Sequence, residues 1–109
     1  MNYKDIKTAL DDLIEHGNAD TFAGLMSDDF EMLSVHQSSV GTKGKNKEQA
    51  IQMMQGLEPM GPANVECHIE TENVIVVTHN SVNDNITMAA NYIENGKISK
   101  CVYFRGPKS

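Results

Sequence analysis

The sequence predicts an α+β domain in which three helices pack on one face of a curved antiparallel sheet. Three observations lead to this fold class. Apolar residues in the first half of the chain recur mainly with helical spacing. Those in the second half alternate with a period of two, which is typical of strands. Turn-forming Asn, Asp and Gly residues divide this second half into short segments.

The first expected helix covers residues 3–16, because its apolar side chains fall on one face and its charged side chains on the other. Gly17 ends it, since glycine adopts the left-handed conformation after a helix at the lowest steric cost. A second, shorter helix follows, with Asp20 as its cap and residues 27–29 as its end. Its expected apolar stripe consists of Phe22, Leu25 and Met26.

The period changes to two at Phe30, which predicts a strand. One side of this strand is expected to carry Phe30, Met32, Ser34 and His36. A loop rich in Gly, Lys and Ser then leads to a third helix, which Asn46 opens and Gln49 supports in a variant of the capping box. The expected buried stripe of that helix is Ala50, Ile51, Met54 and Leu57.

Four strands are expected in the remainder of the chain, over residues 65–71, 74–82, 86–93 and 97–105. The Asn95-Gly96 pair is the strongest local signal, because a two-residue type I′ turn needs positive φ at both positions. Counting from this turn puts one set of side chains on a shared face: Ile86, Met88, Ala90, Tyr92, Ser99, Cys101, Tyr103 and Arg105. A two-residue turn near residues 83–85 would add His79 to this face, whereas a three-residue turn would add Thr78 and Asn80.

Composition indicates the class of protein. The chain has 109 residues, 9 basic and 15 acidic side chains and a net charge of -6. This size fits a single domain over residues 1–109 that buries roughly 65% of its unfolded surface. The acidic excess argues against nucleic-acid and anionic-membrane partners, because both are polyanions.

No apolar run reaches membrane-spanning length and no signal peptide is recognisable, so we expect a cytoplasmic protein. Cys67 and Cys101 stand alone, without zinc-site spacing, so neither a disulfide nor a structural metal is expected. Both faces of the predicted sheet are substantially apolar. We therefore expect a homodimer that covers the face not packed against the helices.

Four short stretches resemble the nuclear transport factor 2-like superfamily, in its SnoaL-like polyketide cyclase and ketosteroid isomerase branch. They are residues 16–20 (HGNAD), 25–30 (LMSDDF), 44–51 (GKNKEQAI) and the hairpin at 95–97 (NGK). The resemblance implies a cone-shaped fold, with a curved sheet wrapped around three helices. It also implies an apolar pocket at the open end and, often, a dimer through the outer face of the sheet.

The same resemblance allows the steroid-isomerase site to be tested by position. The catalytic aspartate of the steroid isomerases corresponds to Ser34 in this chain, and their oxyanion tyrosine corresponds to Leu10. Their late-strand acid falls near Met88. All three functional groups are missing, so steroid isomerase chemistry is not expected.

The expected pocket face still carries groups suited to proton transfer next to a carbonyl. His36 is the expected general base, with Tyr103, Arg105 or His79 as electrophilic helpers. Arg105 is the only arginine and could instead form a salt bridge at the end of its strand, while His36 could simply be solvated. The expected ligand-contacting residues are Leu10, Met32, Ser34, Met54, Met88, Tyr92 and Cys101.

Two functions follow from this pattern. The first is an isomerase, cyclase or dehydratase that acts on a small apolar or carbonyl-containing molecule without a cofactor. The second is a non-catalytic module that holds a small apolar or carboxylated ligand, or that only dimerises. The absent steroid-isomerase groups favour the second, and the resemblance favours the first.

Overall fold

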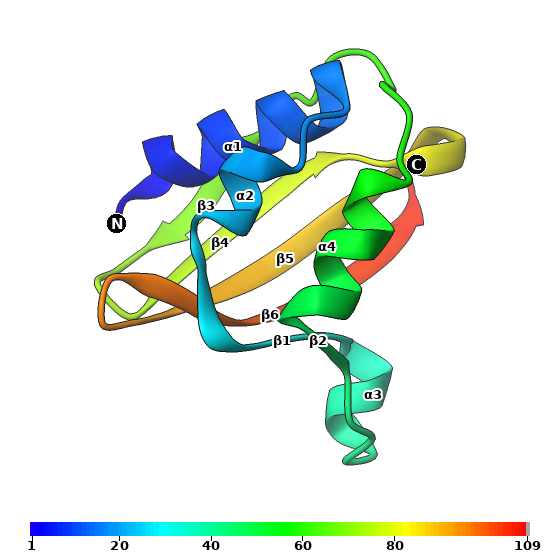
Figure 1. The fold of residues 1–109 in the computed structure, drawn as a ribbon. Helices are drawn as coiled ribbons and strands as arrows, with labels where there is room; N and C mark the ends of the chain where they lie inside the picture. Colours follow the sequence, from blue (N-terminus) through cyan, green and yellow to red (C-terminus); the bar gives the residue numbers. More distant parts are fainter. Residues whose placement is uncertain (109) are drawn as a thin grey trace.

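One curved sheet of six strands, in the order β2-β1-β6-β5-β4-β3, carries the helices of this protein. The computed structural model describes residues 1–108. The strands are β1 (Met26–Ser34), β2 (Lys45–Asn46), β3 (Glu66–Glu70), β4 (Val74–Asn80), β5 (Asn85–Glu94) and β6 (Lys97–Pro107). The helices are α1 (Tyr3–His16), α2 (Asp20–Ala23), α3 (Val35–Ser39), α4 (Lys47–Gln55) and the 3-10 turn η1 (Val82–Asp84). Figure 1 shows α1 and α4 on the same side of the sheet, with α3 projecting away from them.

Helix α1 has the predicted bounds and the predicted end. Asn2 caps its start, where the Asn2 side chain accepts a hydrogen bond from the Asp5 backbone N–H and the Asp5 carboxylate accepts one from the Asn2 backbone. Gly17 follows in the left-handed conformation, with φ 69°. The buried face of α1 consists of Ile6, Ala9, Leu10, Leu13 and Ile14.

The second helix is shorter than predicted. It ends at Ala23, and Met26 begins strand β1, so Leu25 and Met26 are not helical. Asp20 is its first residue, and the preceding cap position is Ala19. Phe22 and Met26 are nevertheless both buried, at 3% and 2% exposure. The sequence therefore identified these core residues correctly and the helix bounds incorrectly.

Strand β1 runs from Met26 to Ser34, so the prediction that His36 extends this strand is wrong. Ser34 caps the extra helix α3, because its hydroxyl accepts a hydrogen bond from Gln37 N at 3.1 Å while Gln37 Oε1 accepts one from Ser34 N at 2.9 Å. A Ser followed three residues later by Gln is a capping-box signal. This signal outweighs an alternation of only a few residues.

Helix α4 begins as predicted at Asn46, which forms a capping box with Gln49. The four later strands are also present and form the predicted antiparallel meander. The α+β class is therefore confirmed. The sequence did not reveal that β1 joins the sheet by parallel pairing with β6, or that the short strand β2 extends the edge beyond β1.

The hairpin of β5 and β6 contains a bulge that the Asn95-Gly96 turn alone does not predict. Glu94 faces Lys97 as predicted, and Ile93 faces Ile98. Tyr92 then faces Lys100, so Ser99 is the extra residue and every later pair is shifted by one. Ile98 and Cys101 are both buried, at 0% and 4% exposure. Two residues three positions apart cannot share one face of a regular strand, and the bulge resolves this conflict.

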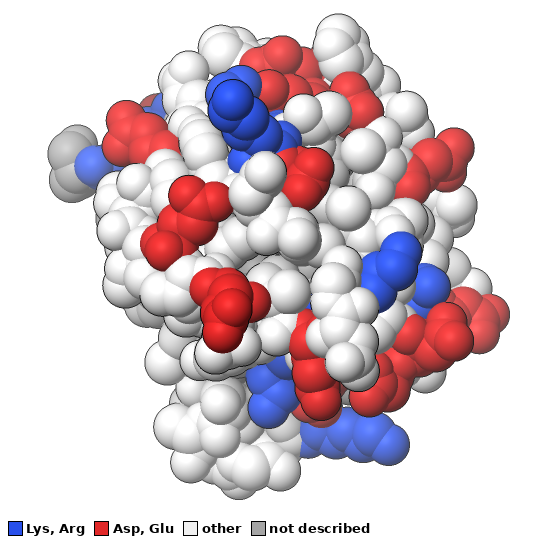
Figure 2. Space-filling model, turned by 90° about the vertical axis from the view of Figure 1, so that its left-hand side faces the viewer, with Lys and Arg blue, Asp and Glu red and all other residues white. Residues whose placement is uncertain are grey.

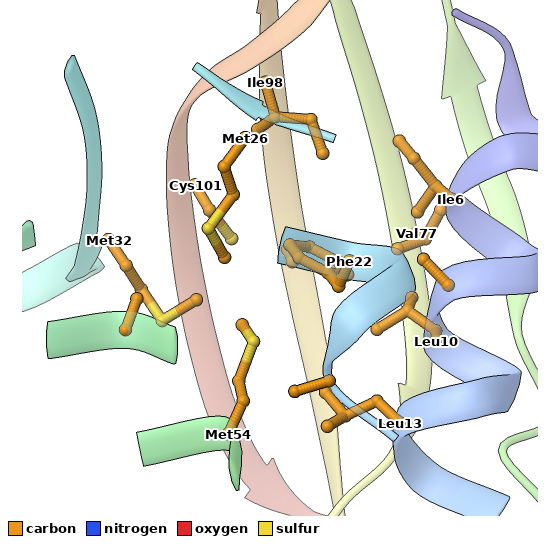
Figure 3. Close-up of a cluster of buried hydrophobic side chains, with 14 of the residues drawn as sticks. Ile6, Leu10, Leu13, Phe22, Met26, Met32, Met54, Val77, Ile98 and Cys101 are labelled. Atoms are coloured by element: carbon orange, nitrogen blue, oxygen red, sulfur yellow. The ribbon is translucent and has the colours of Figure 1, made fainter. Parts of the chain in front are cut away.

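The core lies between the helices and the concave face of the sheet. Figure 3 shows Leu13 of α1 and Met54 of α4 pointing into the same interior, with Phe22 and the side chains of the sheet around them. The central members are among the most buried residues of the chain, including Ile6, Ala50, Ile75, Val77 and Ile98 at 0% exposure. This packing sets the distance between α1, α4 and the sheet.

Acidic side chains are spread over the surface in Figure 2, with lysines between them. This distribution agrees with the net charge of -6. None of the described helices has the length and hydropathy needed to span a membrane.

Candidate functional site

A cavity of about 280 Å³ lies between α1, α4 and the concave face of β4, β5 and β6. A space of this size suits a small organic molecule. Its apolar lining consists of Leu10, Leu13, Ile14, Phe22, Met32, Met53, Met54, Leu57, Met60, Val77, Val82, Ala89 and Cys101. Four of these residues are methionines, whose unbranched side chains adapt readily to ligands of different shape.

The concave face of the sheet carries its side chains in three rows. The row at the open end contains His79, Thr87 and Arg105. The middle row contains Val77, Ala89 and Tyr103, and the inner row contains Ile75, Asn91 and Cys101. Arg105 is exposed, whereas Asn91 is only 1% exposed, so the cavity opens toward the His79 row. Polar groups therefore concentrate at the opening, and a single amide lies at the inner end.

His79 is held in one tautomer by its neighbour. Its Nδ1 lies 2.8 Å from the Asn80 carbonyl oxygen, which can only accept a hydrogen bond. In the neutral ring Nδ1 must therefore carry the proton, which leaves Nε2 with a free lone pair. Burial lowers the pKa of His79 from its ordinary value of 6.5, and the nearby Arg105 charge lowers it further, against the opposing hydrogen bond to Asn80. His79 is thus a neutral proton acceptor at pH 7.

Arg105 supplies a positive charge at the opening, and Tyr103 of the middle row lies next to it. Arg105 Nε donates toward Thr87 Oγ1 at 3.5 Å, and the guanidinium carbon lies 5.9 Å from the centre of the Tyr103 ring. The ion pairs among residues 1–108 involve lysines and do not include Arg105. The expected alternative of a salt bridge at the end of the strand is therefore not formed among these residues. The guanidinium remains available to an anionic ligand group.

The inner row has different chemistry. Burial raises the pKa of the Cys101 thiol to about 12, so this side chain stays protonated and is not a nucleophile at neutral pH. Asn91 Nδ2 donates to the Ile75 carbonyl at 3.3 Å, while Asn91 Oδ1 is buried without a partner among the described residues. Residues 1–108 contain no cluster of three His, Cys, Asp or Glu side chains placed to hold a metal ion.

The structure brings most of the sequence-predicted site residues to this cavity. The lining includes His79, Tyr103, Arg105, Leu10, Met32, Met54 and Cys101. The η1 loop is a three-residue connection, so Thr78 and Asn80 share the Tyr92 face as expected for that case. His79 still reaches Tyr103 and Arg105, because the bulge at Ser99 moves these two residues to the face that His79 occupies.

Four predicted site residues lie elsewhere. His36 is exposed on α3 and does not line the cavity. Ser34 caps α3 and is also absent from the lining. Met88 and Tyr92 point to the outer face, at 47% and 44% exposure, because the bulge changes their cross-strand partners. The first two were misplaced because the Ser34-Gln37 capping box ends the strand, and the other two because of the bulge at Ser99.

Two polar residues of the concave face, Thr87 and Asn91, were not among the predicted site residues; they are 5% and 1% exposed. A signal existed for Asn91, because asparagine is unfavourable inside a strand and stands here within an otherwise strand-like run. A polar residue kept at such a position is a candidate for a specific interaction. The cavity also gains Asn80 and Ser81 from the loop end of β4.

Comparisons with known proteins give information on the fold of this chain. No protein-family model matches the chain, and no curated protein matches it. Solved structures do match. A SnoaL-like protein of unknown function from Burkholderia thailandensis superposes with a TM-score of 0.74 at 12% identity, covering 94% of this chain and 93% of that chain.

An NTF-2 like protein of unknown function from Burkholderia xenovorans gives a TM-score of 0.67 at 17% identity, covering 97% of this chain and 86% of its own. A de novo designed protein with a curved β-sheet gives a TM-score of 0.65 at 12% identity, covering 99% and 90%. Because the same fold accommodates a designed chain, the likeness does not specify an activity. The α+β architecture and these superpositions together show that this chain has the nuclear transport factor 2-like fold of the SnoaL-like proteins.

Proposed function

We propose that this protein binds a small, mainly apolar molecule with a carbonyl or carboxylate group at one end. The observation that carries this proposal is the polarity of the cavity. Its walls are apolar, while His79 and Arg105 lie at its opening and Tyr103 lies one row further in. Apolar pockets with a few convergent polar groups are typical of ligand sites, in which the polar groups orient the ligand.

The opening suits an oxygen-bearing group. Arg105 supplies a permanent positive charge and several N–H donors, which match a carboxylate or a developing oxyanion. Tyr103 is half-buried beside it and adds a hydroxyl donor. A ligand whose apolar part fills the methionine-lined interior would place its polar end here.

The same groups support proton transfer at a carbon next to a carbonyl. His79 Nε2 would remove the proton, which turns the imidazole into an imidazolium and leaves an enolate on the substrate. Arg105 and Tyr103 would stabilise the negative oxygen of that enolate. Return of the proton to a different carbon completes an isomerisation without a cofactor.

A second candidate function is binding without catalysis. The lowered pKa of His79 favours this alternative, because it weakens the imidazole as a base. No carboxylate is paired with His79 among the residues that define the cavity lining. The site can therefore hold a carboxylate or ketone without turning it over.

Two probes separate these functions. Octanoate and 2-octanone each combine an apolar chain with one oxygen-bearing end, and their binding is measured by calorimetry. Exchange of the α-hydrogens of 2-octanone in D2O, followed by NMR, reports proton transfer. Binding with exchange that disappears in His79→Gln supports the catalytic function, and binding without exchange supports the second candidate. Failure of both probes to bind contradicts the proposal.

The outer face of the sheet supports the expected homodimer as a further part of this proposal. Exposed apolar side chains gather there on β5 and β6: Ile86, Met88, Tyr92 and Phe104. A second copy of the chain is the occupant that fits best, because these four side chains are uncharged while the chain carries a net charge of -6. Two such stripes can meet about a two-fold axis with the acidic surfaces kept apart.

The mass in solution tests the dimer. Light scattering of the unmodified chain should give twice the monomer mass of 12.0 kDa. Phe104→Glu, at a side chain that is 63% exposed, should shift the chain toward the monomer because it places like charges opposite one another. Val35→Glu on exposed α3 is the matched control and should leave the mass unchanged. A monomeric unmodified chain at high concentration rules the dimer out.

A further inference from the structure

Asn91 is a polar side chain at the inner end of an apolar cavity. It is only 1% exposed and belongs to the inner row with Ile75 and Cys101. Its Nδ2 donates a hydrogen bond to the Ile75 carbonyl at 3.3 Å. Its Oδ1 is the one buried side-chain acceptor among residues 1–108 that has no partner.

The orientation of this amide follows from its contact. A carbonyl oxygen can only accept a hydrogen bond, so the atom of Asn91 next to Ile75 must be the nitrogen. Rotating the amide would place two acceptors against each other. The oxygen is therefore the atom left free, and leaving a buried acceptor unpaired costs stability. An apolar residue of similar volume would avoid that cost.

The position of Asn91 connects this acceptor to the cavity. Asn91 belongs to the cavity lining, together with Cys101, Met32 and Met54. Methionine side chains adapt with little strain, so this part of the lining can adjust to a molecule that reaches the amide oxygen. Asn91 lies four positions after Thr87 of the opening row, a distance of about 13 Å along the strand. A ligand of moderate length can thus contact both ends.

We infer that Asn91 determines which molecule the cavity selects, by accepting a hydrogen bond at Oδ1 from a hydroxyl or N–H group on the buried end of the ligand. This inference rests on the proposed function, namely that the cavity binds a small molecule whose carbonyl or carboxylate lies near Arg105. The ligand class is then bifunctional: an acceptor or anion at one end, an apolar middle, and a hydrogen-bond donor at the other end.

Three matched probes test this assignment. They are 8-hydroxyoctanoate, 8-methoxyoctanoate and octanoate, which share the carboxylate and the apolar chain. Only the first can donate a hydrogen bond from its far end. Calorimetry should show that the unmodified protein binds 8-hydroxyoctanoate about tenfold more tightly than 8-methoxyoctanoate, the effect of one buried hydrogen bond.

Two variants test whether the preference for 8-hydroxyoctanoate depends on Asn91. Asn91→Leu should remove the preference for the hydroxyl while binding octanoate at least as tightly as the unmodified chain. Thr78→Val is the matched control, because Thr78 is a buried polar residue on the opposite face of the sheet. It should retain the preference.

The outcomes separate the two proposals. If all three probes bind equally, or if octanoate binds more tightly than 8-hydroxyoctanoate, the role of Asn91 is overturned and the ligand cavity stands. If the preference survives in Asn91→Leu, the donor is recognised elsewhere and the assignment is wrong. If none of the probes binds, the proposed function fails and the inference fails with it. The comparison within the unmodified protein holds even if Asn91→Leu does not fold.

Discussion

His79 and Arg105 lie in the same row of the sheet, on either side of Thr87 and two strands apart. The row places a neutral proton acceptor beside a fixed positive charge at the opening of an apolar cavity. The guanidinium charge disfavours a second positive charge nearby, which is one reason why the pKa of His79 is lowered. The two residues therefore differ in charge at neutral pH, and this difference has measurable consequences.

Stability should depend on pH through His79. Its pKa is lowered in the folded chain, whereas the unfolded chain has the ordinary value of 6.5. As the pH falls below 6.5, the unfolded chain takes up this proton first, so the free energy of unfolding decreases. The decrease ends once the pH lies below the folded pKa. His79→Gln should show a weaker loss of stability between pH 7 and about 5, measured by denaturant unfolding.

His36→Gln is the matched control, since His36 is exposed on α3. It should reproduce the pH dependence of the unmodified chain. Identical slopes in His79→Gln and the unmodified chain would show that His79 titrates normally.

Removing the guanidinium should raise the pKa of His79. Arg105→Gln eliminates one of the two causes that lower it, but burial is the larger cause and remains. The pKa should therefore rise and still stay below 6.5. NMR titration of the imidazole protons measures this shift. Lys100→Gln, on β6 and exposed, provides the control and should leave the titration unchanged.

Carboxylate affinity should depend on Arg105. Arg105→Gln should weaken octanoate binding by about tenfold, because a charge-assisted hydrogen bond is lost. Binding of the neutral analogue octanamide should change much less. Raised salt should weaken octanoate binding to the unmodified chain, since Arg105 is exposed and its charge is screened. Equal losses for both probes would place the carboxylate elsewhere.

Gly44 is needed for the approach of its loop to strand β1. A Cβ added there would collide with the Met32 backbone oxygen and would lie 2.7 Å from the Leu33 Cβ. Gly44→Ala should therefore lower the free energy of unfolding by about 1–3 kcal/mol, because the backbone must move. Gly24→Ala is the control, since its Cβ would meet its nearest atom at 3.4 Å and its φ is −66°. Denaturant unfolding compares the two variants, and equal stability would contradict the prediction.

The bulge at Ser99 should be essential to the cavity. Deleting Ser99 restores regular alternation, so Ile98 and Cys101 can no longer both face the core. The variant should lose about 3 kcal/mol or more, comparable to removing a large buried side chain. Ser99→Ala keeps the residue count and should be nearly as stable as the unmodified chain. A deletion variant with full stability would falsify this role of the bulge.

Local patterns in the sequence were sufficient for much of the fold. Helix α1, its glycine end, the Asn46 start of α4 and the Asn95-Gly96 turn were all predicted, because each depends on hydrogen bonds or dihedral angles within a few residues. The meander and the α+β class followed from strand periodicity. The Ser34-Gln37 capping box is an equally local signal, and it contradicts the strand that the alternation predicts at these residues.

The candidate site was determined partly by the sequence and partly by the tertiary structure. The sequence by itself determined which chemical groups are present: one arginine, few aromatic side chains, a late-strand histidine and methionines suited to an apolar interior. Only the tertiary structure decided which of them meet. The burial of Ile98 and Cys101 against the helices imposes a bulge that no local pattern encodes, and this bulge turns Tyr103 and Arg105 toward His79. Side chains alternate along a strand with a period of two, so one extra residue is enough to determine which groups face the cavity.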